Sequence, residues 1–343
     1  MTVVYKELKD TLVLKHRIHG KAEDLPEVFA KLKAVAGDAV ADIPFIVIHF
    51  PLSDDTGRTM DVCLPLSKEV DGGEFEITTI EGGVAATALH KGSYDTILNT
   101  YREMIPEVYK HGHPIQENGR EAFSNLDLEN PEKTVVEIQY PIVGWEFKLD
   151  KHLERVLGKD KRNYVLGGFD KLTMETEQAE RSSIIKEALL KLDEVATEEQ
   201  KYEALSLCGH QFPQELIDKM RDLYIETKSI DTVIQAMLDG HNFYPKMLLR
   251  EGNIIYSKKG PANKAALEKA TTREERMKAT CFCPLLKDMW DEMPGTFCYC
   301  AAGWPRRLFE GILEQPVKVE VSKALTKGDD YCEFAIHLPD SVV

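Results

Sequence analysis

The first side chain that could carry chemistry is the carboxylate of Glu137, which lies in a stretch of alternating apolar and polar residues. Such alternation is typical of a strand with one buried face, so Val136 and Ile138 are expected to cover a core. Glu137 and Gln139 would then point the other way. Asp61 lies in a similar stretch, four residues before a proline as Glu137 is. The two acids are therefore expected to face one cleft.

Aromatic rings are the natural neighbours of a carboxylate that binds a flat, apolar cation. The residues expected to form the walls of this cleft are Phe45, Tyr94, Phe123 and Trp145. The sequence thus predicts a ligand site made of these rings with Glu137 and Asp61. An alternative is that Glu137 lies on a solvated strand face, as polar residues of antiparallel sheets commonly do.

Cysteines form the second group with chemical potential, because six of the seven follow residue 200. Cys281 and Cys283 form one C-x-C pair, Cys298 and Cys300 form another, and Cys208 lies earlier in the same half. Four thiolates can hold zinc or an iron–sulfur cluster. Two alternatives stay open: the thiols pack in a core as small apolar groups, or they carry redox chemistry.

A twofold repeat must position the two acids. Each copy runs strand, helix, strand, strand, and the strands are expected at 11–18, 44–50 and 60–66 and then at 84–89, 121–126 and 134–142. Each first strand ends in a turn with a histidine, His19 or His90, which is expected to hydrogen-bond the backbone or to act as a base. The pattern predicts an α+β domain with one antiparallel sheet, two helices on one face and the cleft on the other.

The remainder of the chain predicts a second α+β domain over residues 176–343, after a charged linker at 148–175. Helices are expected at 177–195, 214–224 and 230–238, the last capped by Ser229. Alternation over 317–321 and 332–338, with a Gly-Asp-Asp turn between them, predicts a closing hairpin. The first domain is expected to span residues 1–147.

Composition narrows the classes of function. The chain has 343 residues, 43% of them hydrophobic, which is enough for two cores. A net charge of −15 argues against binding nucleic acid. No apolar run is long enough for a membrane span, and no signal peptide is recognised, so we expect a cytoplasmic protein without a disulfide framework or a membrane partner.

The stretches from Ala88 to Asp95 and from Val136 to Ile142 resemble those of GyrI-like domains, relatives of the effector-binding domains of multidrug-responsive regulators. The resemblance covers residues 1–147. It implies a tandem βαββ fold in which Glu137 contacts bound hydrophobic cations. Some members resemble hydrolases of cyclopropane-containing alkylating compounds, in which the equivalent glutamate positions or activates water. As no helix-turn-helix pattern occurs, DNA binding is not expected.

The C-terminal cysteines and the segments around them resemble the cysteine-bearing domains of the 4-vinyl reductase-like superfamily. The resemblance implies a small-molecule-sensing module and, in some members, a metal site. A second cysteine expected shortly after Cys208 is absent, and His210 is its candidate replacement. We therefore expect a protein that binds or senses hydrophobic small molecules. The alternatives are a hydrolase that uses Glu137 and a metal- or thiol-dependent C-terminal unit.

Overall fold

The computed structural model describes residues 2–49, 57–113, 119–142, 144–209, 214–240, 247–287 and 289–342. The chain divides into two compact units, residues 1–143 and 144–343. Within the described ranges, no helix is both long and apolar enough to span a bilayer.

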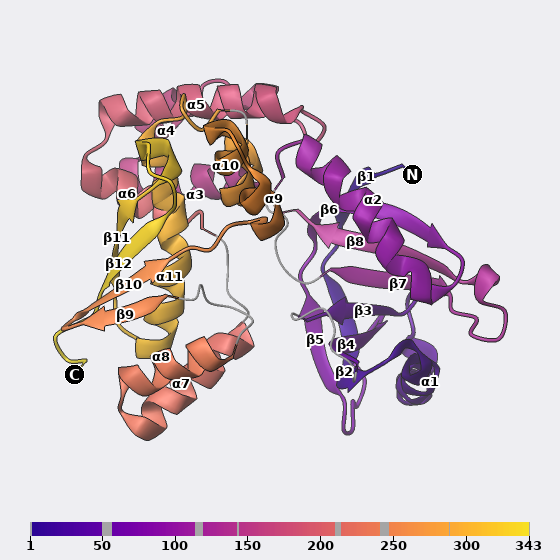
Figure 1. Ribbon diagram of the computed structural model, residues 1–343. Coiled ribbons are helices and arrows are strands. Elements are labelled where there is room, and N and C mark those ends of the chain that lie inside the picture. Colours follow the sequence, from indigo (N-terminus) through magenta and orange to yellow (C-terminus); the bar gives the residue numbers. More distant parts are fainter. Residues whose placement is uncertain are drawn as a thin grey trace. The chain divides into compact units, whose positions relative to one another are not determined.

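The N-terminal unit contains the predicted repeat and two further strands (Figure 1). Its first half consists of β1 (Val4–Leu8), β2 (Thr11–Gly20), α1 (Leu25–Ala36), β3 (Phe45–Ile48) and β4 (Arg58–Pro65). Its second half consists of β5 (Glu76–Ile80), β6 (Gly83–Lys91), α2 (Ile97–Lys110), β7 (Arg120–Asn125) and β8 (Val135–Pro141). The predicted βαββ order is therefore confirmed in both copies, and β1 and β5 are additions that the sequence analysis missed.

All eight strands form one antiparallel sheet in the order β1-β6-β8-β7-β3-β4-β2-β5. Helices α1 and α2 lie against the same face of this sheet (Figure 1). They bury the apolar residues that recur at helical spacing, such as Phe29 and Leu32 in α1 and Met104 and Val108 in α2. The predicted sheet with two helices on one face is confirmed.

The sheet curls strongly, because short links join strands that lie far apart in its order. Strands β5 and β6 are six strand spacings apart, about 29 Å in a flat sheet. Only Glu81 and Gly82 connect them, and such a link spans about 11 Å at most. The link between β1 and β2, residues Lys9 and Asp10, imposes the same constraint. Arg120 of β7, on the face opposite the helices, donates to the backbone carbonyl of Glu81 in the link between β5 and β6, so the sheet curls toward that face and makes it concave.

The two short links cross each other at close range. The Gly82 N–H donates a hydrogen bond of 2.7 Å to the Asp10 side chain. A Cβ atom at Gly82 would lie 2.2 Å from the carbonyl oxygen of Leu8, so only glycine fits at this crossing. Paired residues continue in one register on both sides of it, from Val4 opposite Thr87 to Lys15 opposite Glu76. The links are therefore bends in two long, paired strands.

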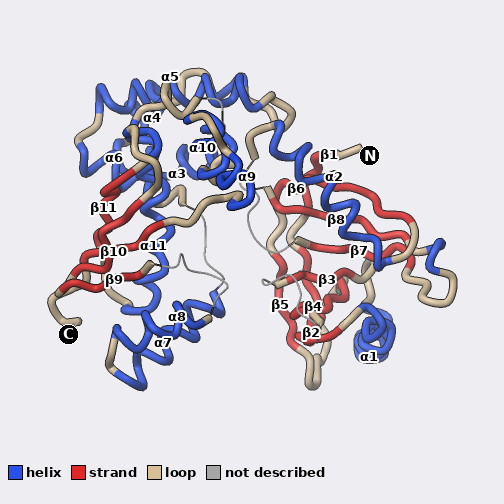
Figure 2. Tube along the Cα trace, viewed as in Figure 1, coloured by secondary structure: helices blue, strands red, loops and turns tan. Residues whose placement is uncertain are grey.

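The C-terminal unit combines helices with strands (Figure 2). The strands form a four-stranded antiparallel sheet in the order β11-β12-β10-β9. Its helices are α3 (Trp145–Leu157), α4 (Lys159–Val165), α5 (Gln178–Val195), α6 (Glu198–Ser206), α7 (Gln214–Thr227), α8 (Ile230–Asp239), α9 (Lys264–Lys269), α10 (Arg273–Thr280) and α11 (Tyr299–Leu313). Its strands are β9 (Leu248–Glu251), β10 (Ile254–Lys258), β11 (Lys318–Lys323) and β12 (Glu333–His337). The predicted helices α5, α7 and α8 and the hairpin of β11 with β12 are present. Ser229 caps α8 as expected.

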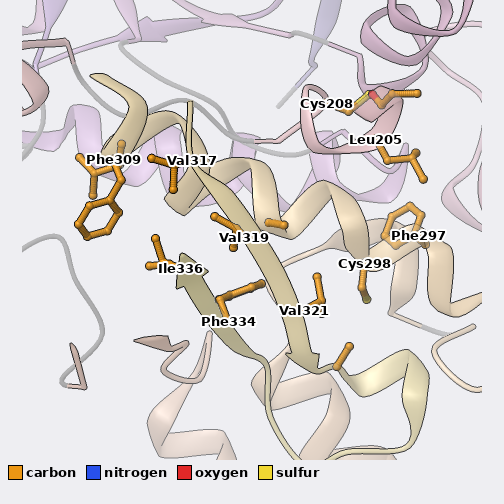
Figure 3. Packing of buried hydrophobic residues seen from close by; sticks show 14 of the residues in the cluster. Leu205, Cys208, Phe297, Cys298, Phe309, Val317, Val319, Val321, Phe334 and Ile336 are labelled. Carbon is orange, nitrogen blue, oxygen red and sulfur yellow. The ribbon is translucent and has the colours of Figure 1, made fainter. Parts of the chain in front are cut away.

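The core of this unit lies between helix α11 and the strands. Val319, Phe334 and Ile336 are buried there with Phe309 of α11 (Figure 3). Their alternation along β11 and β12 is the pattern from which the hairpin was predicted.

The segment 148–175, predicted as a linker, is instead structured and packed. Helices α3 and α4 occupy much of it, and Leu149 and Leu153 are fully buried in the core of the C-terminal unit. Its charged residues lie on outer faces, where Arg162 pairs with Asp150 at 2.5 Å. An amphipathic helix with a highly charged outer face was thus misread as a linker.

Candidate functional site

Glu137 lies on β8 and points away from the two helices, as predicted. Its neighbours across the sheet are Leu89 on β6 and Ala122 on β7. One carboxylate oxygen forms an ion pair with Lys6 of β1, and the other accepts a hydrogen bond of 2.8 Å from the Gln139 amide. The Glu137 side chain remains 24% exposed, so it is held in place and still reachable. We call this concave surface the Glu137 face.

Asp61 shares this face, as predicted, but lies three strands away on β4. Arg17 donates two hydrogen bonds to its carboxylate, at 2.6 and 2.9 Å, and His49 lies 3.0 Å from it. Burial opposes ionisation of Asp61, yet the bonds from His49 and Arg17 outweigh burial and hold its pKa below the usual range. Asp61 is therefore a firmly ionised partner of basic side chains.

An apolar cluster occupies the centre of the Glu137 face, between the two acids. It consists of Val13, Phe45, Cys63 and Ala122, with Val47 and Ile80 packed against it. All four central residues are buried, although the helices lie on the other face. Burial raises the pKa of the Cys63 thiol to about 12, so this cysteine acts as an apolar group.

Arg120 of β7 extends over this cluster. Its guanidinium lies 5.9 Å from the centre of the Phe45 ring and donates to the backbone carbonyl of Glu81, in the link between β5 and β6. The residue is only 9% exposed. Burial lowers the pKa of Arg120, which is the response of a cation that has lost water without gaining a carboxylate.

Three of the expected aromatic walls lie elsewhere, which corrects the predicted cleft. Phe123 follows Ala122 and so points to the helix face, where it packs against Phe29 and Tyr94. Tyr94 begins a short turn before α2 on that face. Trp145 begins α3 in the C-terminal unit and packs against Phe297. Strand parity and the earlier domain boundary explain the errors. Phe45, two strands from Glu137, is the predicted wall residue that the N-terminal unit places on the Glu137 face.

A second buried acid, Glu121, was missed by the sequence analysis. It lies on the helix face with no exposed surface and accepts hydrogen bonds from the hydroxyls of Tyr94 and Tyr101. Arg58 lies 3.3 Å from the same carboxylate. Burial raises the pKa of Glu121. Glu121 pairs across the sheet with Ile138, whose side chain faces the helices. A glutamate at such a helix-facing position is the signal in the sequence that could have revealed this buried acid.

The histidines at the two turns have structural partners. His90 is buried and contacts the carbonyl oxygen of Ser93 at 3.0 Å and the hydroxyl of Thr100 at 2.8 Å. The backbone role expected for this residue is therefore confirmed. His19 contacts the hydroxyl of Thr59 at 3.1 Å.

The C-terminal cysteines gather from separate segments. Cys281 follows α10, Cys298 precedes α11, and Cys300 lies in the first turn of α11. Burial raises the pKa of Cys283 and of Cys300, the thiol of Cys300 raises the pKa of Cys283 further, and the thiols of Cys298 and Cys208 do the same to Cys300. In the described ranges, however, no three Cys, His, Asp or Glu side chains are placed to hold a metal ion.

These thiols do not fit a preformed zinc or iron–sulfur site, so no chemical step is assigned to such a group. His210, the candidate additional ligand, lies outside the described residues. Zinc or an iron–sulfur cluster at these cysteines stays a prediction.

Burial raises the pKa of both Cys281 and Cys298 to about 12. Because the thiolate is the reactive form, we expect iodoacetamide at pH 8 to modify both cysteines at least about a hundredfold more slowly in the native protein than in urea. Mass spectrometry of timed samples measures each rate. Rapid native modification would instead indicate a stabilised thiolate and favour thiol chemistry at these positions.

Comparisons with known families agree with the geometry of the N-terminal unit. Residues 1–143 match the model of the GyrI-like small molecule binding domain, and this unit is a GyrI-like domain. Residues 256–343 match DUF6144, a family of unknown function. No curated protein matches the chain. The 4-vinyl reductase-like resemblance gains no support from these matches and stays a prediction.

Solved structures similar to the chain include the EcmrR C-terminal domain, at 18% identity and a TM-score of 0.37, covering 41% of this chain and 97% of that domain. SAV2435 bound to tetraphenylphosphonium matches at 14% identity and a TM-score of 0.32, covering 43% and 97%. A hydrolase encoded by lin2189 from Listeria innocua matches at 13% identity and a TM-score of 0.36, covering 41% and 92%.

Proposed function

We propose that the N-terminal unit binds apolar, often cationic small molecules on the Glu137 face. The observation that carries this proposal is the apolar cluster around Phe45, which lies on the same concave surface as a partly exposed carboxylate. A concave, largely apolar surface with a few fixed polar groups is the usual form of a ligand site. The family of this unit, defined by small-molecule binding, supports the same function.

Lys6 occupies the position that a ligand cation would take beside Glu137. The Lys6 side chain is 42% exposed and comes from edge strand β1, so it can leave at little cost. Leu89, directly opposite Glu137 in the sheet, is 48% exposed and offers apolar contact beside the carboxylate. We propose that an apolar cation displaces Lys6 and packs against Leu89.

Calorimetric titration with tetraphenylphosphonium tests this proposal on the full chain. We expect Glu137→Gln to weaken binding about fivefold, because an ion pair at a partly exposed site contributes about 1 kcal/mol. Glu132→Gln, a change to an exposed acid outside the strands, is the matched control and should bind as the wild type does. Equal affinity of the wild type and Glu137→Gln would exclude Glu137 as the cation site, and no binding to the wild type would contradict the proposed function.

A second candidate function is hydrolysis of cyclopropane-containing alkylating compounds, with Glu137 positioning or activating water. The observation that favours it is the Glu137 carboxylate, which is 24% exposed and is held in place by the Gln139 amide at 2.8 Å. A carboxylate fixed at an accessible site is a suitable general base for water. Product analysis after incubation with such an alkylator separates the two functions, because binding without product excludes the hydrolase.

A further inference from the structure

Most of the buried or partly buried charges described on the Glu137 face are paired. Lys6 pairs with Glu137, and Arg17 pairs with Asp61. Lys15 lies 3.0 Å from Glu76. For Arg120, in contrast, the described ranges contain no carboxylate oxygen within 4.0 Å. Among the described residues, Arg120 is therefore a buried cation without a carboxylate partner, beside the apolar cluster.

An uncompensated guanidinium is costly where Arg120 lies. The residue is 9% exposed, and its neighbours include the ring of Phe45. A buried charge is ordinarily paired, since the loss of water is not otherwise repaid. A buried cation to which no described residue supplies a counterion therefore points to an anion that binds beside it.

With respect to the described residues, the N–H donors of Arg120 are also largely unused. A guanidinium carries five N–H donors, and the hydrogen bond that the structure shows for Arg120 is the one to the Glu81 carbonyl. The planar fork of arginine matches a carboxylate, which it binds through two parallel hydrogen bonds. Val13, Phe45 and Ala122 beside it are buried, so the surroundings of the guanidinium are largely apolar.

We infer that Arg120 is an anion subsite and that the natural ligand of the Glu137 face is an apolar molecule carrying a carboxylate. The inference rests on the proposed function, because it places the ligand on the same face. It refines the ligand class, since Glu137 alone would select cations. A molecule that carries both charges would satisfy both subsites.

Two probes of the same shape, 2-naphthoate and its neutral analogue 2-naphthamide, measure the contribution of the ligand's negative charge to binding. We expect calorimetry on the full wild-type chain to give at least about tenfold tighter binding of the naphthoate, the size of a hydrogen-bonded charge contact. Arg120→Gln should remove this preference and leave the naphthamide affinity unchanged. Arg102→Gln, on the exposed surface of α2, is the matched control and should keep the preference.

Arg120 also joins β7 to the link at Glu81, so its loss could weaken the fold. Arg120→Lys keeps the positive charge but loses the planar guanidinium that forms two parallel hydrogen bonds. We expect this variant to retain part of the preference for naphthoate. A purely structural role would change both affinities together and leave their ratio unchanged. Equal binding of the two probes to the wild type, or an undiminished preference in a folded Arg120→Gln protein, would overturn the inference.

The inference and the proposed function fail in different ways. Binding of tetraphenylphosphonium that depends on Glu137, without any preference for naphthoate, would overturn only the anion subsite. Absence of binding by all three probes would contradict the proposed function itself.

Discussion

Replacement of Arg181 by methionine is expected to lower the free energy of unfolding of the C-terminal unit by about 3–5 kcal/mol, the cost of leaving a buried partner charge uncompensated. The Arg181 side chain is 1% exposed and that of Glu146 is 7% exposed, and the two form an ion pair. Arg181 also donates to the backbone carbonyl of Thr173. The substitution therefore leaves two acceptors without their donor.

Urea unfolding monitored by tryptophan fluorescence measures this effect in the correct unit, because Trp145, Trp290 and Trp304 all lie after residue 143. The double variant Arg181→Met, Glu146→Gln should recover a large part of the lost stability, because the second change removes the unpaired charge of Glu146. Arg155→Met, which breaks an exposed pair with Glu203, should cost less than about 1 kcal/mol. A loss below about 1 kcal/mol in Arg181→Met would contradict the buried-pair interpretation.

Replacement of Gly303 by alanine is expected to cost about 3 kcal/mol or more, because the added methyl group has no space. A Cβ atom at this position of α11 would lie 1.7 Å from the carbonyl oxygen of Ser206, at the end of α6. Backbone atoms cannot rotate away as a flexible side chain can. Helix α11 would have to separate from α6, which would disturb the contacts of Cys300 and Cys208 nearby.

The same fluorescence measurement reports the Gly303→Ala effect. Gly295→Ala is the matched control, because its Cβ would meet Lys327 at an ordinary 3.6 Å. We expect this control to change stability by no more than about 0.5 kcal/mol. Similar unfolding curves for the two alanine variants would show that α6 and α11 separate freely and would contradict the close packing.

The repeat and its strands were predictable because period-two alternation is a local signal. Strand β8 shows this, since its apolar residues at 136 and 138 cover the helix side and Glu137 points the other way. Strands β1 and β5 were missed because each has few buried residues to reveal an alternating pattern. Their pairing depends on partners about 80 and 65 residues away in sequence, which local patterns do not encode.

The candidate site was predicted only in part, for similar physical reasons. The direction of Glu137 followed from alternation, whereas the position of Phe123 depended on strand parity, where an error of one residue reverses the face. Arg120 gave no signal, since an arginine at the start of a strand is common on exposed surfaces. That no described carboxylate lies beside it is a property of the folded sheet, which a local stretch of sequence does not show.

The crossing of the two long strands at Gly82 makes the halves of the repeat mutually dependent. Strand β1 precedes the first copy in the chain but pairs with β6 of the second, and β5 precedes the second copy but pairs with β2 of the first. Neither copy can complete its own sheet, so a break in the loop between β4 and β5 would yield two fragments that must exchange strands to fold. Each fragment would also carry half of a binding surface, because Phe45 and Asp61 come from one and Glu137 and Arg120 from the other.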